Sequence, residues 1–428
     1  MARLLVAAAL SAFQPQGLAQ NDLGATNVLS LEDAKRIAFE RNWDLLAAKS
    51  GVDTATAQLL VAKEFPNPTF SYSTARIGSR NNSTTLGNGL GERSYDTIFA
   101  VNQLIEIGGK RRDRQASARA GITGARARFY DARRLLDQGV TKAYVAVVLA
   151  DENARILEAS ARMLRHEVEI AQARLKAGDL SDSDEKQIEN NLDVFALQAE
   201  SAKAAAVQAR IALEILLGVE HAKGNWTPAE SLTQLSVSAP QAEEASTSRL
   251  RPDVLAAESD WKQSQFDLKL QKAMRIPDPT FSVLAEHNPP AGSPPEDTFG
   301  IGVSFPLPLW NFNRGEIKSA QTKVDQNALA LAKAKAMVAS DVANAESKYR
   351  EAAERFHRYQ NQILPKSQKV RESVAFAYEK GGATLVDLLE AERADNDARL
   401  AAVQAQADTA SAVADLKAAT EVMNNEKP

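Results

Sequence analysis

The chain has 428 residues, of which 44 % are hydrophobic and only 6 % aromatic, and a formal net charge of −4. This charge balance, with no long Lys/Arg run, argues against a general affinity for nucleic acid. Because there is no cysteine, we expect no disulfide, thiolate metal site, cysteine nucleophile or cysteine-linked lipid anchor. Alanine supplies much of the apolar content, so we expect helices packed in narrow seams rather than around a large aromatic core.

Residues 1–19 are predicted to be a secretory signal peptide. Arg3 precedes an apolar run from Leu4 to Phe13, and small residues follow up to Ala19. The alternative is a buried N-terminal helix. No other stretch is a continuous apolar run of about 20 residues, so we predict an exported protein without a transmembrane helix. Any crossing of a membrane would then be made by strands.

An internal repeat organises the rest of the chain. The segment PNPTFS, with Pro66 and Pro68, returns as PDPTFS, with Pro277 and Pro279. In each half, a helix precedes this motif, and a pair of strands and a long helical hairpin follow it. The repeat predicts one body made of two similar halves.

The first repeat is assigned to residues 20–217. Its first helix is predicted to begin after Ser30, which has an acid three residues on, and to continue to about Glu64. A strand pair is predicted within residues 67–107, and a helical hairpin within 110–217. The first helix of this hairpin meets no breaker before Ala177.

The second repeat is assigned to residues 249–424, after a less regular segment, 218–248, that is predicted to decorate the helical body. Its strand pair is predicted within 278–309. Its hairpin is predicted within 315–422, with one break in the first helix, at Pro365. Residues 425–428 are expected to be a frayed tail.

The fourth predicted strand has the clearest alternation in the chain. Phe299, Ile301, Val303 and Phe305 alternate with Gly300, Gly302 and Ser304. An apolar outer face and a small or polar inner face over about 10 residues match a tilted strand that crosses an outer membrane. The alternative for one strand alone is a half-buried sheet in a soluble domain, but four such strands favour the membrane.

Four strands cannot close a barrel, and an open edge would leave backbone groups unpaired in hydrocarbon. Two copies of the chain would give about eight strands and a filled lumen, whereas three would give about twelve and an aqueous bore. We therefore predict a mainly α protein with a small β part. It would form a trimer with a 12-stranded outer membrane β-barrel, continued by helices that line a hollow cylinder.

The sequence resembles the TolC family of outer membrane efflux channels, within it the metal-efflux branch of CzcC and CusC. The residues that carry the resemblance are the two motifs at Pro66 and Pro277, RPDVLAA from Arg251, Leu364-Pro365, YEKG from Tyr378 and DLLEA from Asp387. The resemblance implies a homotrimer with a long periplasmic α-helical barrel, set in outer membrane lipid. The implied partners are a periplasmic adaptor (membrane fusion) protein and an inner-membrane RND pump, with no nucleic acid.

Gly178, and Gly381 with Gly382, mark the predicted turns between the long helices. By resemblance, these turns form the narrow periplasmic end of the channel. The family's founding member has an arginine in the second turn that helps to lock the closed state, whereas Ala383 stands there in this chain. Any lock would therefore use other contacts, such as Tyr378 against the opposite turn.

Three carboxylates next to these turns are the candidate gate residues. Asp184 follows the first turn, and Asp387 and Glu390 follow the second on one helix face. By resemblance, three copies would place them in rings that favour cations. The alternative is that acids in a first helical turn merely complement the helix dipole.

Trp310 and Phe312, at the end of the fourth predicted strand, are candidates for an aromatic anchor at the membrane interface. Packing at the junction of strand and helix is the alternative. The four histidines are not spaced as zinc ligands, and His287 is expected in an outer loop. No nucleophile–base–acid set and no phosphate-binding loop follow the required pattern, so we predict no catalytic residue, metal site or cofactor.

These features predict a passive outer membrane duct that exports metal cations, not an enzyme. The same duct serving multidrug efflux or type I secretion stays open. A periplasmic adaptor protein is a more distant alternative, because that class has one hairpin and a β-rich remainder. An exported hydrolase would need a catalytic set that the sequence does not offer.

Overall fold

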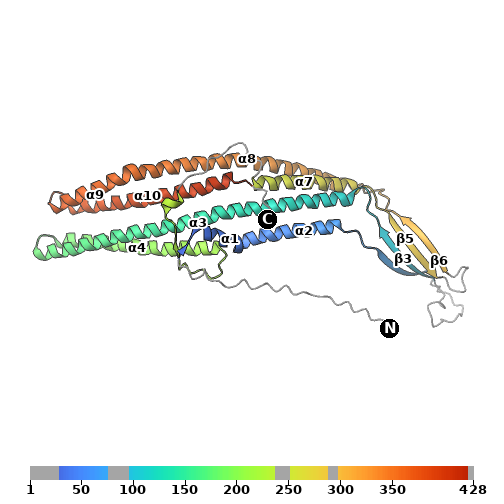
Figure 1. The fold of residues 1–428 in the computed structure, drawn as a ribbon, viewed down its shortest axis with the longest axis horizontal. Helices are drawn as coiled ribbons and strands as arrows, with labels where there is room; N and C mark the ends of the chain where they lie inside the picture. The colour runs from blue at the N-terminus through green and yellow to red at the C-terminus, as the bar shows by residue number, and fades with distance from the viewer. Residues whose placement is uncertain (1–27, 76–95, 237–250, 288–296, 423–428) are drawn as a thin grey trace, which may run out of the picture. The chain divides into compact units, whose positions relative to one another are not determined.

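A computed structural model describes residues 28–75, 96–236, 251–287 and 297–422 (Figure 1). The predicted signal peptide and tail lie outside these residues, as do residues 76–95 and 288–296 within the two predicted strand pairs. The described chain is mainly helical with a small sheet, which confirms the predicted fold class. None of its helices combines the length and apolar character that a membrane span needs. The chain divides into two compact units.

The four-stranded sheet belongs to the unit formed by residues 44–135, 240–347 and 416–428. Its strands, in spatial order, are β2 (Thr69–Ala75), β3 (Asp96–Leu104), β5 (Thr280–His287) and β6 (Asp297–Ser304), and each neighbouring pair is antiparallel. The strand pairs of both repeats therefore join in one sheet. Within the described chain, β2 and β6 each have one edge without a strand beside it.

One face of this sheet is apolar and exposed. Its cross-strand pairs are Phe70 with Val101, Tyr72 with Phe99, Phe281 with Val303, and Val283 with Ile301. All eight side chains are exposed, and Ile301 keeps 91 % of its surface. On the opposite face, Leu284 covers Gly300, where a Cβ atom would lie 3.1 Å from its side chain. The predicted alternation of the strands is thus present across the sheet.

The helices of the same unit pack with few large side chains. They are α2 (Trp43–Lys63), α7 (Pro252–Ala273), and the sheet-proximal parts of α3 (Lys110–Ala177) and α8 (Arg314–Arg358). Val254 of α7 packs on Leu331 and Val338 of α8. Beside them lies Arg251, whose side chain is only 3 % exposed. Its guanidinium donates hydrogen bonds to the carboxylates of Asp253 and Asp341, which balance its charge.

The second unit, residues 1–43, 136–239 and 348–415, contains the far ends of both helical hairpins. Besides parts of α3 and α8 it holds α1 (Leu31–Arg41), α4 (Asp182–Leu216), α5 (Leu232–Leu235), η2 (Tyr359–Ile363), α9 (Leu364–Glu379) and α10 (Leu385–Thr420). A short parallel pair, β1 (Val28–Leu29) with β4 (Thr227–Pro228), completes it. The sequence did not indicate this pair.

The predicted single helix after Ser30 is wrong, because it is broken at Asn42 into α1 and α2. Asn42 leaves the helical conformation, with ψ 125°, and its side-chain amide donates to the carbonyl of Leu216. Gly218, just after the end of α4, also packs closely against the backbone at the end of α1. A Cβ atom on Gly218, whose φ is +79°, would lie 2.5 Å from the carbonyl oxygen of Arg41. Tertiary contact therefore overrides a continuous helical pattern.

Three smaller predictions also need correction or refinement. The break at Pro365 is the π-helical turn η2, as expected where proline cannot donate to the preceding turn. His287 does not lie in a loop but ends β5, with Nδ1 2.8 Å from a carboxylate oxygen of Asp297. Because β6 ends at Ser304, Trp310 and Phe312 lie in the connection to α8 rather than at the end of the strand.

A buried tyrosine fastens the short β1–β4 pair to α3. The hydroxyl of Tyr144 lies 2.8 Å from the carbonyl oxygen of Leu29 and within hydrogen-bond distance of the Glu230 carboxylate, and it accepts from the amide of Ala229. Burial and the Glu230 carboxylate raise the pKa of Tyr144, so the hydroxyl stays protonated and can donate. The same carboxylate accepts from the amide of Leu31.

We expect Tyr144→Phe to loosen the β1–β4 pair without changing the helices. Losing a buried hydroxyl leaves its partners unsatisfied, at a cost of about 1–3 kcal/mol. Amide hydrogen exchange should therefore be roughly five- to a hundredfold faster at Leu29 and Ala229. Tyr349→Phe, on the partly exposed Tyr349 of α8, is the control and should leave these amides unchanged. Equal effects of both variants would contradict the assigned role.

Candidate functional site

Two inter-helix turns define the far end of the second unit. Gly178 lies between α3 and α4 with φ +84°, and Gly381 lies between α9 and α10 with φ +74°. This left-handed conformation favours glycine and ends a helix sharply. Gly382 follows, and its amide donates back to the carbonyl of Ala377. Each long hairpin thus reverses within a few residues.

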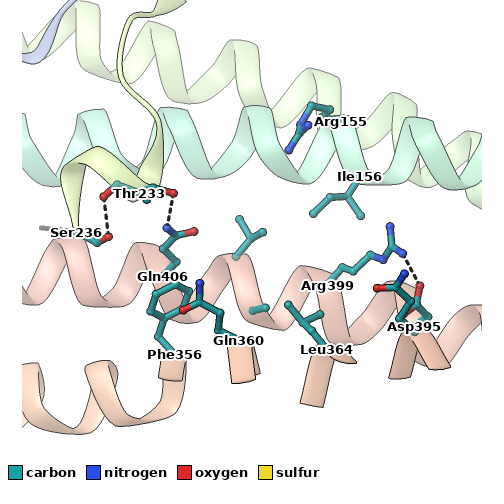
Figure 2. A pocket seen from close by; sticks show the side chains of 13 residues that line it. Arg155, Ile156, Thr233, Ser236, Phe356, Gln360, Leu364, Asp395, Arg399 and Gln406 are labelled. Carbon is teal, nitrogen blue, oxygen red and sulfur yellow. Dashed lines mark hydrogen bonds and ion pairs between the residues drawn. The ribbon is translucent and has the colours of Figure 1, made fainter. Parts of the chain in front are cut away.

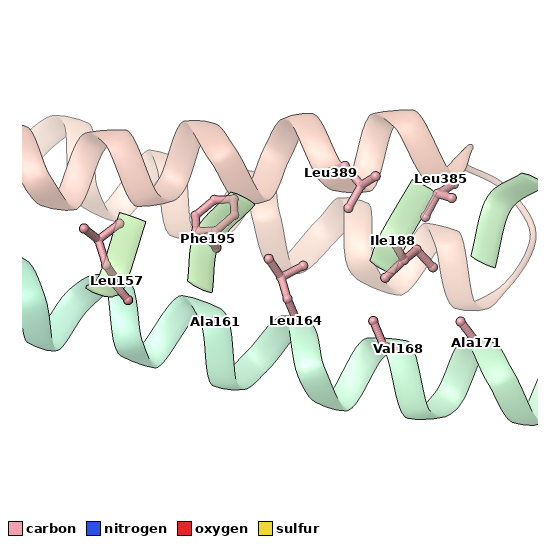
Figure 3. Close-up of a cluster of buried hydrophobic side chains, with 10 residues drawn as sticks. Leu157, Ala161, Leu164, Val168, Ala171, Ile188, Phe195, Leu385 and Leu389 are labelled. Atoms are coloured by element: carbon pink, nitrogen blue, oxygen red, sulfur yellow. The ribbon is translucent and has the colours of Figure 1, made fainter. Parts of the chain in front are cut away.

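A hydrophobic cluster packs the two hairpins together next to these turns (Figure 3). Helix α10 contributes Leu385 and Leu389, and α4 contributes Ile188, Phe195 and Ala199. A stripe along α3 completes the cluster: Leu157, Ala161, Leu164, Val168 and Ala171. Residues some 200 positions apart in the sequence therefore meet in this cluster, and the two hairpins share one hydrophobic contact.

Asp387 takes part in a hydrogen-bonded cap at the start of α10. Its carboxylate accepts from the amide and the hydroxyl of Thr384, at 2.9 and 2.7 Å, and the Thr384 hydroxyl oxygen accepts from the amide of Asp387. The bonds from Thr384 lower the pKa of this exposed carboxyl. Capping accounts for Asp387 within one chain. A ring of three Asp387 side chains requires further copies and stays a prediction.

The charge of Asp184 on α4 acts on Tyr378 of α9, whereas Glu390 is simply exposed on α10. The amide of Asp184 donates to Ser181, the N-cap of α4. Burial of Tyr378 against the cluster raises its pKa; Arg174 opposes this rise and the charge of Asp184 adds to it. The guanidinium of Arg174 lies 5.7 Å from the centre of the Tyr378 ring. Arg174 was not among the residues predicted from the sequence.

A set of buried charges behind the turns was not predicted from the sequence. Asp395 of α10 pairs with Arg371 of α9 at 3.3 Å and with Arg399 at 2.9 Å. One turn earlier on α10, Glu392 keeps only 8 % of its surface. Burial, together with the charge of Glu167 on α3, raises the pKa of Glu392 to about 7, although Arg371 opposes the rise.

One signal could have found Glu392. It lies three residues after Leu389 and seven after Leu385, so it continues the buried stripe of α10. An ionisable residue on an apolar helix stripe is a candidate for a perturbed group. The acids nearest the turns were predicted instead; Asp387 and Glu390 are exposed and Asp184 is partly exposed.

A pocket of about 670 Å³ lies alongside these charges in the same unit (Figure 2). Phe356, Gln360 and Leu364, from α8, η2 and α9, form one wall, while Asp395 and Arg399 of α10 form another. Among the residues that the structure describes, no group of three or more His, Cys, Asp or Glu side chains is placed to hold a metal ion. The walls supply paired charges and amides, not a ligand set.

The remaining candidates lie beside the sheet. The carbonyl oxygen of Pro66 accepts from the side chain of Gln103, and that of Pro279 accepts from the amide of Ile105. With Pro68 and Pro277, these prolines lie in the segments directly before β2 and β5. Trp310 keeps 91 % of its surface, and the guanidinium of Arg314 lies 5.6 Å from the centre of the Phe312 ring.

Comparison with known proteins places these features in a family. The chain matches the family model described as outer membrane efflux protein over residues 24–219 and 246–421, one segment for each repeat. It is 25 % identical over 402 residues to the cobalt-zinc-cadmium resistance protein CzcC of Cupriavidus metallidurans, covering 90 % of each chain.

Solved structures share the fold at lower identity. A crystal structure of CusC superimposes with a TM-score of 0.78 at 17 % identity, covering 95 % of this chain and 96 % of that one. The CmeC outer membrane channel of Campylobacter jejuni gives a TM-score of 0.75 at 21 % identity, covering 91 % and 85 %.

We expect Asp387→Ala to fray the first turn of α10, because the amide of Thr384 loses its acceptor. Asp387→Asn keeps a side-chain oxygen and should fray it less. Because the pKa of Asp387 is lowered in the folded chain, the cap should also weaken as pH falls through that lowered value. Hydrogen exchange at residues 384–388 measures both effects. Glu390→Ala is the control; a similar rise there would argue against the cap.

Proposed function

The chain belongs to the outer membrane efflux protein family, and on this premise we propose that it is the passive outer membrane duct of a tripartite efflux system. The observation that carries the proposal is the open-edged sheet with one exposed apolar face. In water this exposed apolar face would promote aggregation, whereas in lipid it is the favourable outer surface of membrane strands. The long hairpins then lie on the periplasmic side.

Assembly of the duct requires copies of the chain. In the described residues, β2 and β6 leave an edge unpaired, and unpaired backbone groups are costly in hydrocarbon. Pairing β6 of one copy with β2 of the next removes both edges, and three copies give about twelve strands around an aqueous bore. We therefore propose a homotrimer whose helices continue the bore as an α-helical barrel.

We propose metal cations as the cargo. The resemblance to CzcC across 90 % of the chain supports this choice, and a duct that passes a cation needs no tight site for it. Rings of Asp184, Asp387 and Glu390 at the narrow end would favour cations over anions. The fold itself does not separate metal export from multidrug efflux or type I secretion, since CusC and CmeC match it about equally well.

A passive duct needs partners that bring the cargo and supply the energy. We propose a periplasmic adaptor protein that engages the hairpins and an inner-membrane RND pump that selects the metal. The residues of the duct then serve passage and gating. This division also fits the described part of the chain, where the buried Asp395 is paired with Arg371 and Arg399.

A lysine on the apolar face of the sheet tests the membrane assignment. Ile301→Lys puts a charge among lipid tails, at a cost of up to about 2–4 kcal/mol, and we expect at least a tenfold drop in assembled trimer in the outer membrane. Ser282→Lys is the matched control on the opposite face, next to Gly302. Quantitative blotting of membrane fractions gives the answer, and equal losses for both variants would argue against lipid contact at Ile301.

Growth of a strain lacking the gene tests the cargo. We expect hypersensitivity to some of cobalt, zinc, cadmium, nickel, copper and silver salts, and no change with dyes, bile salts or antibiotics. The intact gene and the Ser282→Lys gene should restore growth, whereas the Ile301→Lys gene should not. Sensitivity to organic compounds alone would overturn the metal assignment and leave the duct.

A further inference from the structure

We propose that Glu167 of α3 and Glu392 of α10 form a proton-operated latch between the two helical hairpins. When at least one of the two carboxyls carries a proton, the hairpin ends pack closely. When both are ionised, their repulsion loosens the start of α10 from α3. The latch is a property of this bundle, and only its consequence for the opening of the duct rests on the proposed function.

The position of Glu392 makes it part of the contact between the hairpins. It extends the buried stripe that Leu385 and Leu389 form on α10, and that stripe packs on Leu164 and Val168 of α3. Glu167 directly precedes Val168 and is itself half-buried. The two carboxyls therefore lie where the hairpins meet, and a change in their charge acts on the packing itself.

One carboxylate oxygen of Glu392 is left without a hydrogen bond from the described residues. Its Oε2 atom is buried and has no hydrogen-bond partner in the described part of the chain. A buried carboxylate without hydrogen bonds is costly, and a protonated carboxyl is much less so. The environment therefore favours the neutral acid, which is what a latch that closes on protonation requires.

The neighbouring cations are already engaged. Arg371 of α9 binds Asp395, its Nη1 atom lies 3.5 Å from the sulfur of Met163 on α3, and Arg399 binds Asp395 as well. Arg393 of α10 donates to the side-chain oxygen of Asn191 on α4. Arg371 still attracts Glu392 and opposes its neutral form, but it also pairs with Asp395 and lies 4.0 Å from Glu372.

Further charges on the surrounding helices act mainly on Glu167. Burial raises its pKa, the adjacent His166 on α3 opposes this, and Glu379 at the end of α9 adds to it. On α4, Glu185 is buried but pairs with Lys186. The charge of Glu167 in turn disfavours the ionised form of Glu392, so ionising Glu392 beside an ionised Glu167 is the unfavourable step.

The direction of the pH effect follows from linkage. The pKa of Glu392 is raised from its ordinary value to about 7 in the packed bundle, so the packed state holds its proton more tightly than a loosened state does. Packing is then strongest below about pH 4.5. It weakens as pH rises and levels off above about pH 7. A lower periplasmic pH would therefore hold the hairpin ends together.

Hydrogen exchange of the full-length trimer in detergent, corrected for intrinsic rates, tests the latch. In the wild type we expect the protection of amides 385–395 to fall about tenfold or more between pH 5.5 and pH 8.5. Glu392→Gln mimics the neutral acid, so its protection should stay high and nearly flat. Glu167→Gln removes the repelling partner and should shrink the fall, which keeps the test valid if Glu392→Gln assembles poorly.

Asp397→Asn is the matched control, because this exposed aspartate lies on the same helix five residues away; it should behave as the wild type. A flat wild-type profile, or an undiminished fall in both Glu392→Gln and Glu167→Gln, would overturn the latch. The growth assays test the proposed function separately from the latch. A strain without a metal phenotype can still carry a protein whose bundle responds to pH.

Discussion

The structure depends on one constraint: a single chain cannot bury the apolar face of its own sheet. Phe70, Phe99, Ile301 and their neighbours stay exposed, while β2 and β6 keep one edge each without a partner in the described chain. In most proteins a helix would cover such a face. Here the helices pack with one another instead, which leaves the sheet free for lipid and for further copies of the chain.

The helical part, in contrast to the sheet, has little apolar surface and must bury it within narrow contacts between helices. Its seams are built from alanine and single leucines, such as Ala161 beside Leu164, so helices lie close and small changes in side-chain volume matter. Between these seams the chain buries charges. Most of them are paired, as Arg251 is with Asp253 and Asp341. Glu392 is an exception, because its buried Oε2 atom has no hydrogen-bond partner in the described chain. Its protonation can therefore control how the helices pack.

The sequence predicted most accurately where local signals are strong. Gly109 and Gly178 bracket α3, whose observed span, Lys110–Ala177, is the expected one. It failed where contacts between distant segments decide the local structure. At Asn42, a hydrogen bond to the carbonyl of Leu216 accompanies the break in the helix. Strand β1 is too short to show a pattern in the sequence. For the candidate site, the turns and Asp387 were visible as motifs. The burial of Glu392 was not, because it depends on which face of α10 meets α3.

The π-helical turn η2 separates α8 from α9 within one long rod. Each π turn inserts one residue into the α-helical ladder and so rotates everything beyond it by roughly a hundred degrees about the rod. Beyond η2, Ser367 and Arg371 of α9 contact Asp395 of α10. The residue inserted at η2 therefore sets which side chains of α9 meet α10.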